Sequence, residues 1–256
     1  MNQIKLRSHQ ATTLNRMSHH KKGQVIVPTG GGKTMCMIED VKREIKQADY
    51  RRTFVVVAPR ILLAQQLCEE FLEQITGVNV LHVHSGETHH TSTTKPEKIK
   101  TFCIYPLHLH TIIFTTYHSL HRIQEADIDV DSIYFDEAHN STAKNFFPSV
   151  EHYSAEAKRC YFFTATPKHS LTISKPGMND CYVYGKVIVN IPAPKLVKEG
   201  YILPPKMIVK TINVAEEDVN ECKHIVDTID EISVKKVLIC ARSTKQIIKL
   251  IDQTNF

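Results

Sequence analysis

The chain has 256 residues, of which 42% are hydrophobic and 23% charged, as is typical of a soluble globular protein with one or two domains. The sequence shows no apolar run of the roughly 18–20 residues that a membrane span needs, and its first five residues lack the apolar core of a secretory signal. Seven cysteines without a CxxC pair argue against a disulfide framework and a zinc ribbon, so we expect an intracellular protein. The net charge of +5 allows a polyanionic partner but does not require one.

Short apolar runs alternate with amphipathic stretches along the first two thirds of the chain. The pattern predicts strands at 24–27, 53–58, 80–84, 111–115, 132–136 and 159–164, and helices at 34–47 and 61–75. The strand runs are continuously apolar, which is typical of parallel strands covered on both faces. We therefore predict an α/β fold with a three-layer parallel sheet between helices, and ligands at the carboxyl ends of the strands.

The character of the sequence changes after Pro167. We predict a first domain over residues 1–168 and, because Pro and Gly recur with little periodicity, a linker over 169–205. Residues 206–256 resemble the incomplete beginning of a second α/β unit, with strands at 206–210 and 236–240 and a helix between them.

A glycine-rich motif follows the first predicted strand and opens the first helix. It reads Pro28-Thr29-Gly30-Gly31-Gly32-Lys33-Thr34. Such a turn lets backbone N–H groups face a phosphate, and the helix adds its positive dipole end. Lys33 would bind the β- and γ-phosphates and Thr34 would ligate Mg²⁺. Val27 stands where the full phosphate-loop pattern has glycine, and a glycine-rich turn with a chance lysine is the alternative.

An acidic motif, Asp136-Glu137-Ala138-His139, follows the strand predicted at 132–136. Asp136 can hold Mg²⁺ through water, and Glu137 can polarise the attacking water. A lone acidic turn after a buried strand would be the alternative. Together with the phosphate loop, the motif predicts hydrolysis of a nucleoside triphosphate, with Lys33, Asp136 and Glu137 as catalytic residues.

In this combination the chain resembles the superfamily 2 helicases and translocases, with the DEAH spelling at 136–139. Leu6-Arg7-Ser8-His9-Gln10 resembles the family's nucleotide-sensing element. The resemblance implies a RecA-like fold in which Gln10 reads the adenine edge with help from Arg7, and a phosphate loop of Thr29 to Thr34 that binds ATP. A helix start capped by Ser8 is the alternative for this segment.

Three further strand-end motifs follow the order of that family. Ala58-Pro59-Arg60 and Thr115-Thr116-Tyr117 resemble segments that contact the nucleic-acid backbone, which implies this role for Pro59, Arg60, Thr115 and Thr116. Thr164-Ala165-Thr166-Pro167 resembles the motif that couples nucleotide state to nucleic acid, which implies that His139, Thr164 and Thr166 couple the two sites. Taken singly, a proline turn and a threonine pair with β propensity remain alternatives.

The resemblance implies an ATP- and Mg²⁺-dependent nucleic-acid helicase or translocase, with DNA slightly favoured over RNA. In the family a second RecA-like lobe supplies arginines to the γ-phosphate, and we find no such element before Phe256. The alternative is therefore a catalytically incomplete, ATP-responsive nucleic-acid-binding module that needs a second chain or a further segment. A small-molecule kinase would explain neither the DEAH spelling nor the ordered motifs.

Histidines cluster in the middle of the sequence, and two pairs, His82/His84 and His108/His110, have the HxH spacing that metals use. Paired cysteines and a fixed carboxylate partner are missing from this pattern. We therefore predict solvated or core histidines rather than a metal site. The nearby Lys95, Lys98 and Lys100 are more typical of a solvated face than of a nucleic-acid surface.

Overall fold

A computed structural model describes residues 5–105, 109–172 and 174–204, together with 209, 221–232, 237, 239–241 and 243–253. The chain divides into two compact units, Met1–Pro204 and Pro205–Phe256, which are considered separately below. Within the described residues, every helix is too short or too polar to cross a membrane.

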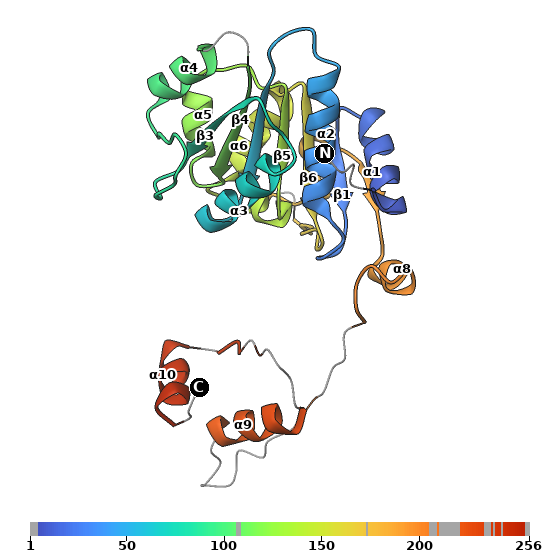
Figure 1. Cartoon of the computed structure of the whole chain (residues 1–256), viewed down its shortest axis with the longest axis vertical. Helices are drawn as coiled ribbons and strands as arrows, with labels where there is room; N and C mark the ends of the chain where they lie inside the picture. The colour runs from blue at the N-terminus through green and yellow to red at the C-terminus, as the bar shows by residue number, and fades with distance from the viewer. Residues whose placement is uncertain are drawn as a thin grey trace. The chain divides into compact units, whose positions relative to one another are not determined.

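The first unit is built around a seven-stranded sheet with the order β3-β4-β2-β5-β6-β1-β7 (Figure 1). All of its pairings are parallel. The strands are β1 Lys22–Ile26, β2 Thr53–Ala58, β3 Val78–Val83, β4 His110–Thr116, β5 Ser132–Phe135, β6 Arg159–Thr164 and β7 Val187–Asn190. The six strands predicted from apolar runs are confirmed, and the parallel sheet follows from burial of both faces.

Helices cover both faces of the sheet and complete the predicted three layers. One hydrophobic core lies under α1 Ser8–Ser18, α2 Lys33–Lys46 and α3 Ile61–Leu72. The other lies under α4 Pro96–Ile104, α5 Leu120–Glu125, α6 Phe147–Glu156 and α7 Cys181–Tyr184. Successive residues of β2 alternate between the cores: Phe54 and Val56 join the first, and Val55 and Val57 the second.

The segment 169–205, predicted as a linker, is instead part of the first unit up to Pro204. It contains α7, the seventh strand β7 beside β1, and α8 Ala193–Lys198. Gln24 of β1 donates from Nε2 to the Met178 and Gly185 carbonyl oxygens at 2.8 and 3.1 Å, which fixes the segment to the sheet. Its Pro and Gly residues lie at the ends of short elements, as Gly185 does after α7 and Pro194 at the start of α8, which explains the weak periodicity.

The described residues of the second unit form two helices, α9 Glu221–Ile232 and α10 Thr244–Gln253. The helix predicted between the two strands of this unit corresponds to α9. The strands predicted at 206–210 and 236–240 lie mostly outside the described residues.

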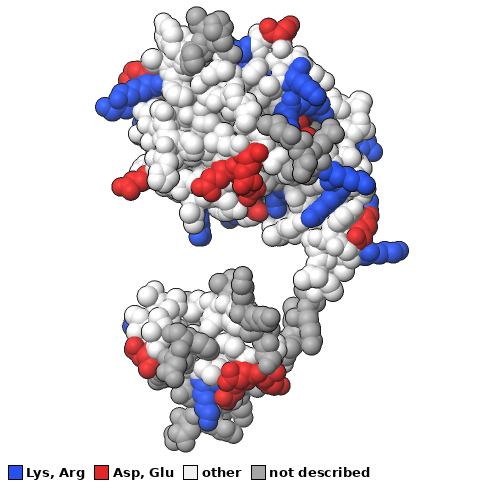
Figure 2. Space-filling model, viewed as in Figure 1, with Lys and Arg blue, Asp and Glu red and all other residues white. Residues whose placement is uncertain are grey.

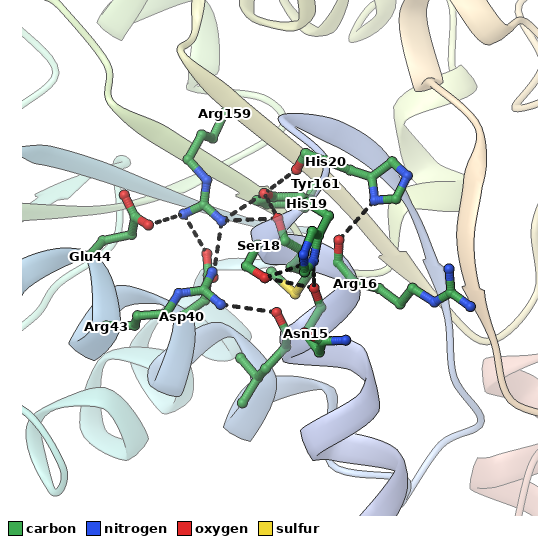
Figure 3. Close-up of polar contacts among 12 residues, drawn as sticks. Asn15, Arg16, Ser18, His19, His20, Asp40, Arg43, Glu44, Arg159 and Tyr161 are labelled. Atoms are coloured by element: carbon green, nitrogen blue, oxygen red, sulfur yellow. Dashed lines mark hydrogen bonds and ion pairs between the residues drawn. The ribbon is translucent and has the colours of Figure 1, made fainter. Parts of the chain in front are cut away.

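A buried charge network holds α1 and α2 against the sheet (Figure 3). Asp40 of α2 is fully buried and accepts hydrogen bonds from Arg159 Nη1 and Nη2 at 2.9 and 3.0 Å. Arg43 also forms an ion pair with Asp40, and Arg159 Nη1 lies 3.0 Å from Glu44 Oε1 in a further ion pair. Arg43 and Tyr161 donate in addition to backbone carbonyls of α1. The network fixes the helices that carry the two N-terminal motifs relative to β6.

Candidate functional site

The glycine-rich loop lies between β1 and α2, at the carboxyl edge of the sheet. Gly30 and Gly32 have φ of +75° and +81°, a left-handed conformation that favours glycine. A Cβ on Gly31 would lie 2.5 Å from Val27 Cγ1 and 2.9 Å from Pro28 O, so this position also needs glycine. Val27 itself is fully buried in the core and its φ is not positive, so the loop does not require glycine at that position.

Side chains at the start of α1 form hydrogen bonds with the backbone carbonyl oxygens of this loop. Arg7 Nη1 lies 3.2 Å from Gly30 O, His9 Nε2 lies 2.7 Å from Gly31 O and Gln10 Nε2 lies 3.4 Å from Gly32 O. The Gly31 N–H donates to Pro28 O at 2.9 Å, so the N–H groups that can bind an anion are those of Gly32 and the first turn of α2. The loop therefore has the geometry of a preformed phosphate cradle.

The amide of Gln10, predicted to read adenine, is occupied in this arrangement. Its Oε1 accepts from the Arg7 backbone N–H at 2.9 Å, and its Nε2 faces the loop. Adenine recognition therefore stays a prediction. The sequence predicts no role for His9, although it is 1% exposed and makes the shortest of the three loop contacts.

Tyr201, which follows α8, is a second residue whose contact with this site the sequence does not predict. The Arg7 guanidinium carbon lies 5.0 Å from the centre of its ring, a cation–π distance, and the His9 ring centre lies 5.3 Å away. Tyr201 was placed in the predicted linker, so nothing in the pattern linked it to the loop. In the structure it supports the two side chains that support the loop.

The acidic motif lies at the end of β5 and reaches the phosphate loop. Glu137 has φ of +44°, an uncommon left-handed conformation for a glutamate. The Asp136 N–H donates to Val57 O and the Tyr117 hydroxyl donates to Asp136 O, both at 2.8 Å. Glu137 Oε1 lies 3.3 Å from Lys33 Nζ, so the structure brings together two motifs that are a hundred residues apart.

The electrostatics of this acidic pair favour a cation. Burial, followed by the neighbouring Glu137 carboxylate, raises the pKa of Asp136 to about 6, and Lys33 opposes the rise. A divalent cation would offset the repulsion between the two carboxylates and so favour their ionised forms. Thr34, in the first turn of α2, adds a hydroxyl oxygen, and hard oxygen donors of this kind suit Mg²⁺. The residues present therefore fit the predicted ion.

A chain of contacts connects the acidic motif with the loop that follows β6. His139 Nδ1 lies 3.4 Å from Glu137 Oε2 and 3.1 Å from Thr164 Oγ1. Thr164 Oγ1 in turn accepts from the Thr166 backbone N–H at 3.1 Å. The structure thus brings the three predicted coupling residues, His139, Thr164 and Thr166, into one connected series.

A family model described as type III restriction enzyme, res subunit, matches residues 3–169. The chain belongs to this family. The match contains the phosphate loop, the acidic motif and the coupling series, so the first unit is a helicase-like domain of the res-subunit family. No curated protein matches the chain.

Solved structures agree with this assignment at the level of fold. The type ISP restriction-modification enzyme LlaBIII matches with a TM-score of 0.64 and 21% identity over 77% of this chain and 16% of its own. The related LlaGI matches with a TM-score of 0.63 and 20% identity over 91% of this chain and 23% of its own. The UvsW helicase of bacteriophage T4 matches with 0.53 and 12% identity over 72% of this chain and 60% of its own. The fold is RecA-like, and the chain spans less than a quarter of the two restriction enzymes.

The predicted nucleic-acid contacts of this res-subunit domain divide into two kinds. Arg60, after Pro59 at the end of β2, is exposed just before α3. Thr115 is fully buried and its hydroxyl donates to Val83 O at 2.7 Å, so its side chain is engaged within the protein, and its contact with nucleic acid stays a prediction. Thr116 keeps only 4% of its surface exposed. Figure 2 shows basic side chains in separate groups on the visible face, with acidic ones between them, rather than one continuous basic stripe.

Proposed function

We propose that this chain is the ATP-hydrolysing part of a DNA translocase or helicase. The single observation that carries the proposal is the 3.3 Å contact between Lys33 of the phosphate loop and Glu137 of the acidic motif. A lysine that binds the γ-phosphate and a glutamate that activates the attacking water must lie close to the same phosphate, and the direct contact between Lys33 and Glu137 supports this arrangement. We also propose that residues 206–256 begin a second RecA-like lobe.

The first step is binding of the triphosphate by a loop that is already formed. Loop N–H groups and the α2 N-terminus would bind the phosphate oxygens, with Lys33 as the charged partner. Arg7, His9 and Gln10 hold the carbonyl side of the loop, so little ordering is needed when the substrate arrives.

The second step is activation of water by Glu137. Lys33 is 9% exposed and paired with Glu137 in the structure. Phosphate oxygens would compete for the Lys33 ammonium, which releases the carboxylate to accept a proton from the attacking water. When bound, Mg²⁺ supplies charge stabilisation to the phosphates, and Thr34 and Asp136 are the residues that would hold it.

The third step couples the movement of the Glu137 carboxylate to the loop that follows β6 and, through it, to bound DNA. His139 touches both Glu137 and Thr164, so movement of the carboxylate alters the contacts of Thr164 and the N–H of Thr166. DNA is favoured as the partner because the matched LlaBIII structure is bound to DNA and that of LlaGI is a complex with a DNA substrate mimic. Exposed Arg60 is the residue we expect to contact its backbone.

The experiment is steady-state ATP hydrolysis by the 256-residue chain with single-stranded DNA, duplex DNA or RNA, accompanied by direct measurement of ATP binding. We expect binding in every condition and the greatest stimulation of turnover by DNA. Binding without turnover on any nucleic acid would favour the ATP-responsive module that needs a partner. Absence of ATP binding would contradict the proposed site itself.

A further inference from the structure

The edge of the sheet carries a second polar cluster that the nucleotide site does not use. Cys68 of α3, His82 of β3 and His90 of the following loop have ligand atoms that all lie within 4.8 Å of one another. Three donors around a tetrahedral zinc ion lie roughly 3.3–3.6 Å apart, so a small inward shift brings them to bonding distance. His90 is partly exposed, so its side chain is the ligand that can adjust by rotation while its backbone stays in place.

The arrangement of His82 gives an independent indication of a ligand. His82 is fully buried, yet its Nε2 atom has no hydrogen-bond partner within the described part of the chain. A buried polar atom without a partner costs about 1–3 kcal/mol and is rare in native proteins. His82 and His90 both line an open cavity of about 710 Å³ through which an ion can enter.

The loop that carries His90 is fixed against β3 beside His82. The His82 N–H donates to Thr91 O at 2.9 Å, and the Thr93 N–H donates to His82 O at 3.0 Å. The two imidazole rings stack with 5.5 Å between centres and 8° between planes. Backbone pairing thus places His90 beside His82 without an ion.

We propose that Cys68, His82 and His90 form a binding site for a zinc ion, with the fourth position open to water from the cavity. One thiolate and two imidazoles are a donor set that selects zinc over magnesium or calcium. The site is distinct from the nucleotide site, and it ties α3 to the loop after β3.

The protonation states fit an ion that is bound through neutral imidazole and thiolate. Burial and the neighbouring His84 lower the pKa of His82 to about 4, so the imidazole is neutral at ordinary pH. Burial raises the pKa of Cys68 to about 12, so without a metal this residue remains a thiol. Zinc binding would therefore release one proton from the Cys68 Sγ atom.

His84 is positioned to orient His82. Its Nε2 lies 3.0 Å from His82 Nδ1, and its Nδ1 accepts from the Gly86 N–H at 3.2 Å. In the metal-bound form His82 Nε2 faces the ion and its Nδ1–H donates to His84 Nε2. His84 then carries its proton on Nδ1. Because a protonated Nδ1 cannot accept a hydrogen bond, the 3.2 Å hydrogen bond from the Gly86 N–H is lost. Histidine ligands usually donate their second N–H in this way.

The test is titration of the full chain with Co²⁺, whose thiolate charge-transfer and d–d absorption bands report tetrahedral sulfur and nitrogen ligation, followed by competition with Zn²⁺. We expect one ion per chain with both bands, displaced by Zn²⁺. Cys68→Ser and His90→Ala should each weaken binding roughly 100-fold or more, because one of three protein ligands is lost. His90→Ala changes a loop residue, so it keeps the test informative even if Cys68→Ser fails to fold.

Two matched variants control for the protein's other thiols and imidazoles. Cys103→Ser changes another buried helical cysteine, and His121→Ala an exposed histidine, and both should leave the bands unchanged. Absence of a thiolate band in the unmodified chain, or equal Co²⁺ affinity in His90→Ala and the parent, would overturn the proposed site.

Discussion

The loops after β1, β5 and β6 differ from those after β2 and β4, although all lie at the same edge of one sheet. In the first group the predicted side chains meet each other, as Lys33 meets Glu137 and His139 meets Thr164. In the second group they diverge, because Arg60 is exposed whereas Thr115 is buried. The side chains of the first group are positioned by contacts with one another within the chain. The side chains of the second group do not contact one another, so only binding of DNA can show which of them contribute.

The largest effect should come from the charge network that holds the first group together. Arg159→Met removes two hydrogen bonds from the fully buried Asp40, which keeps Arg43 and Tyr134, and it also removes the ion pair with Glu44, so it should lower the free energy of unfolding by about 3 kcal/mol. Denaturant unfolding measures the change. As a control, Arg122→Met removes an exposed pair with Glu125 and should change stability by about 0.5 kcal/mol or less. Equal effects of the two variants would contradict the importance of the network.

Loss of the phosphate-loop lysine should come next. Lys33→Ala should lower ATP turnover by roughly 10²–10³-fold, because one charged group that stabilises the transition state is removed. Lys42→Ala, on the same helix and paired only at the surface with Glu39, serves as the matched control with near-normal turnover. Unchanged turnover in Lys33→Ala would disprove the assignment of the loop.

A smaller effect should separate coupling from binding. Thr164→Val removes the hydroxyl that contacts His139 while keeping the shape of the side chain. ATP affinity should stay the same and stimulation by nucleic acid should fall roughly tenfold, the equivalent of one hydrogen bond. Thr166→Val keeps its backbone N–H and should retain stimulation. A loss of ATP binding in Thr164→Val would assign the residue to the nucleotide site instead.

The smallest effects should distinguish the two strand ends of the second group. Arg60→Ala should weaken DNA binding several-fold at every sequence and lower the salt dependence by about one phosphate contact. Thr115→Val should leave DNA binding unchanged and cost about 1 kcal/mol of stability, because its hydroxyl donates to Val83 O. Salt-dependent binding isotherms measure the first effect and denaturant unfolding the second, and a DNA-binding defect in Thr115→Val would show that its hydroxyl contacts DNA after all.

The same contrast shows how far the sequence could predict the molecule. Apolar runs located six of the seven strands, and short motifs predicted Lys33 and Glu137, because each depends on neighbours in sequence. The burial of Thr115 and Thr116 could not be predicted, because both faces of the sheet are covered and how far the covering extends at a strand end depends on distant segments. β7 was missed because it is only four residues long and lies among Pro and Gly.

Contacts between distant segments were equally hidden. Tyr201 reaches Arg7 across nearly two hundred residues, and Cys68 reaches His90 through the packing of α3 beside the sheet edge. The sequence showed the HxH spacing of His82 and His84, but these rings contact each other and His82 turns its other nitrogen elsewhere. Spacing along a strand indicates a shared face, not a shared ligand.

The most direct test of the account is the Glu137→Gln variant, measured for ATP binding and for hydrolysis in parallel. The amide keeps the size of the side chain but cannot accept the proton of the attacking water. We predict near-normal ATP affinity with turnover reduced by roughly 10²-fold or more. Normal hydrolysis by Glu137→Gln would contradict the central claim that the acidic motif and the phosphate loop form one hydrolytic site.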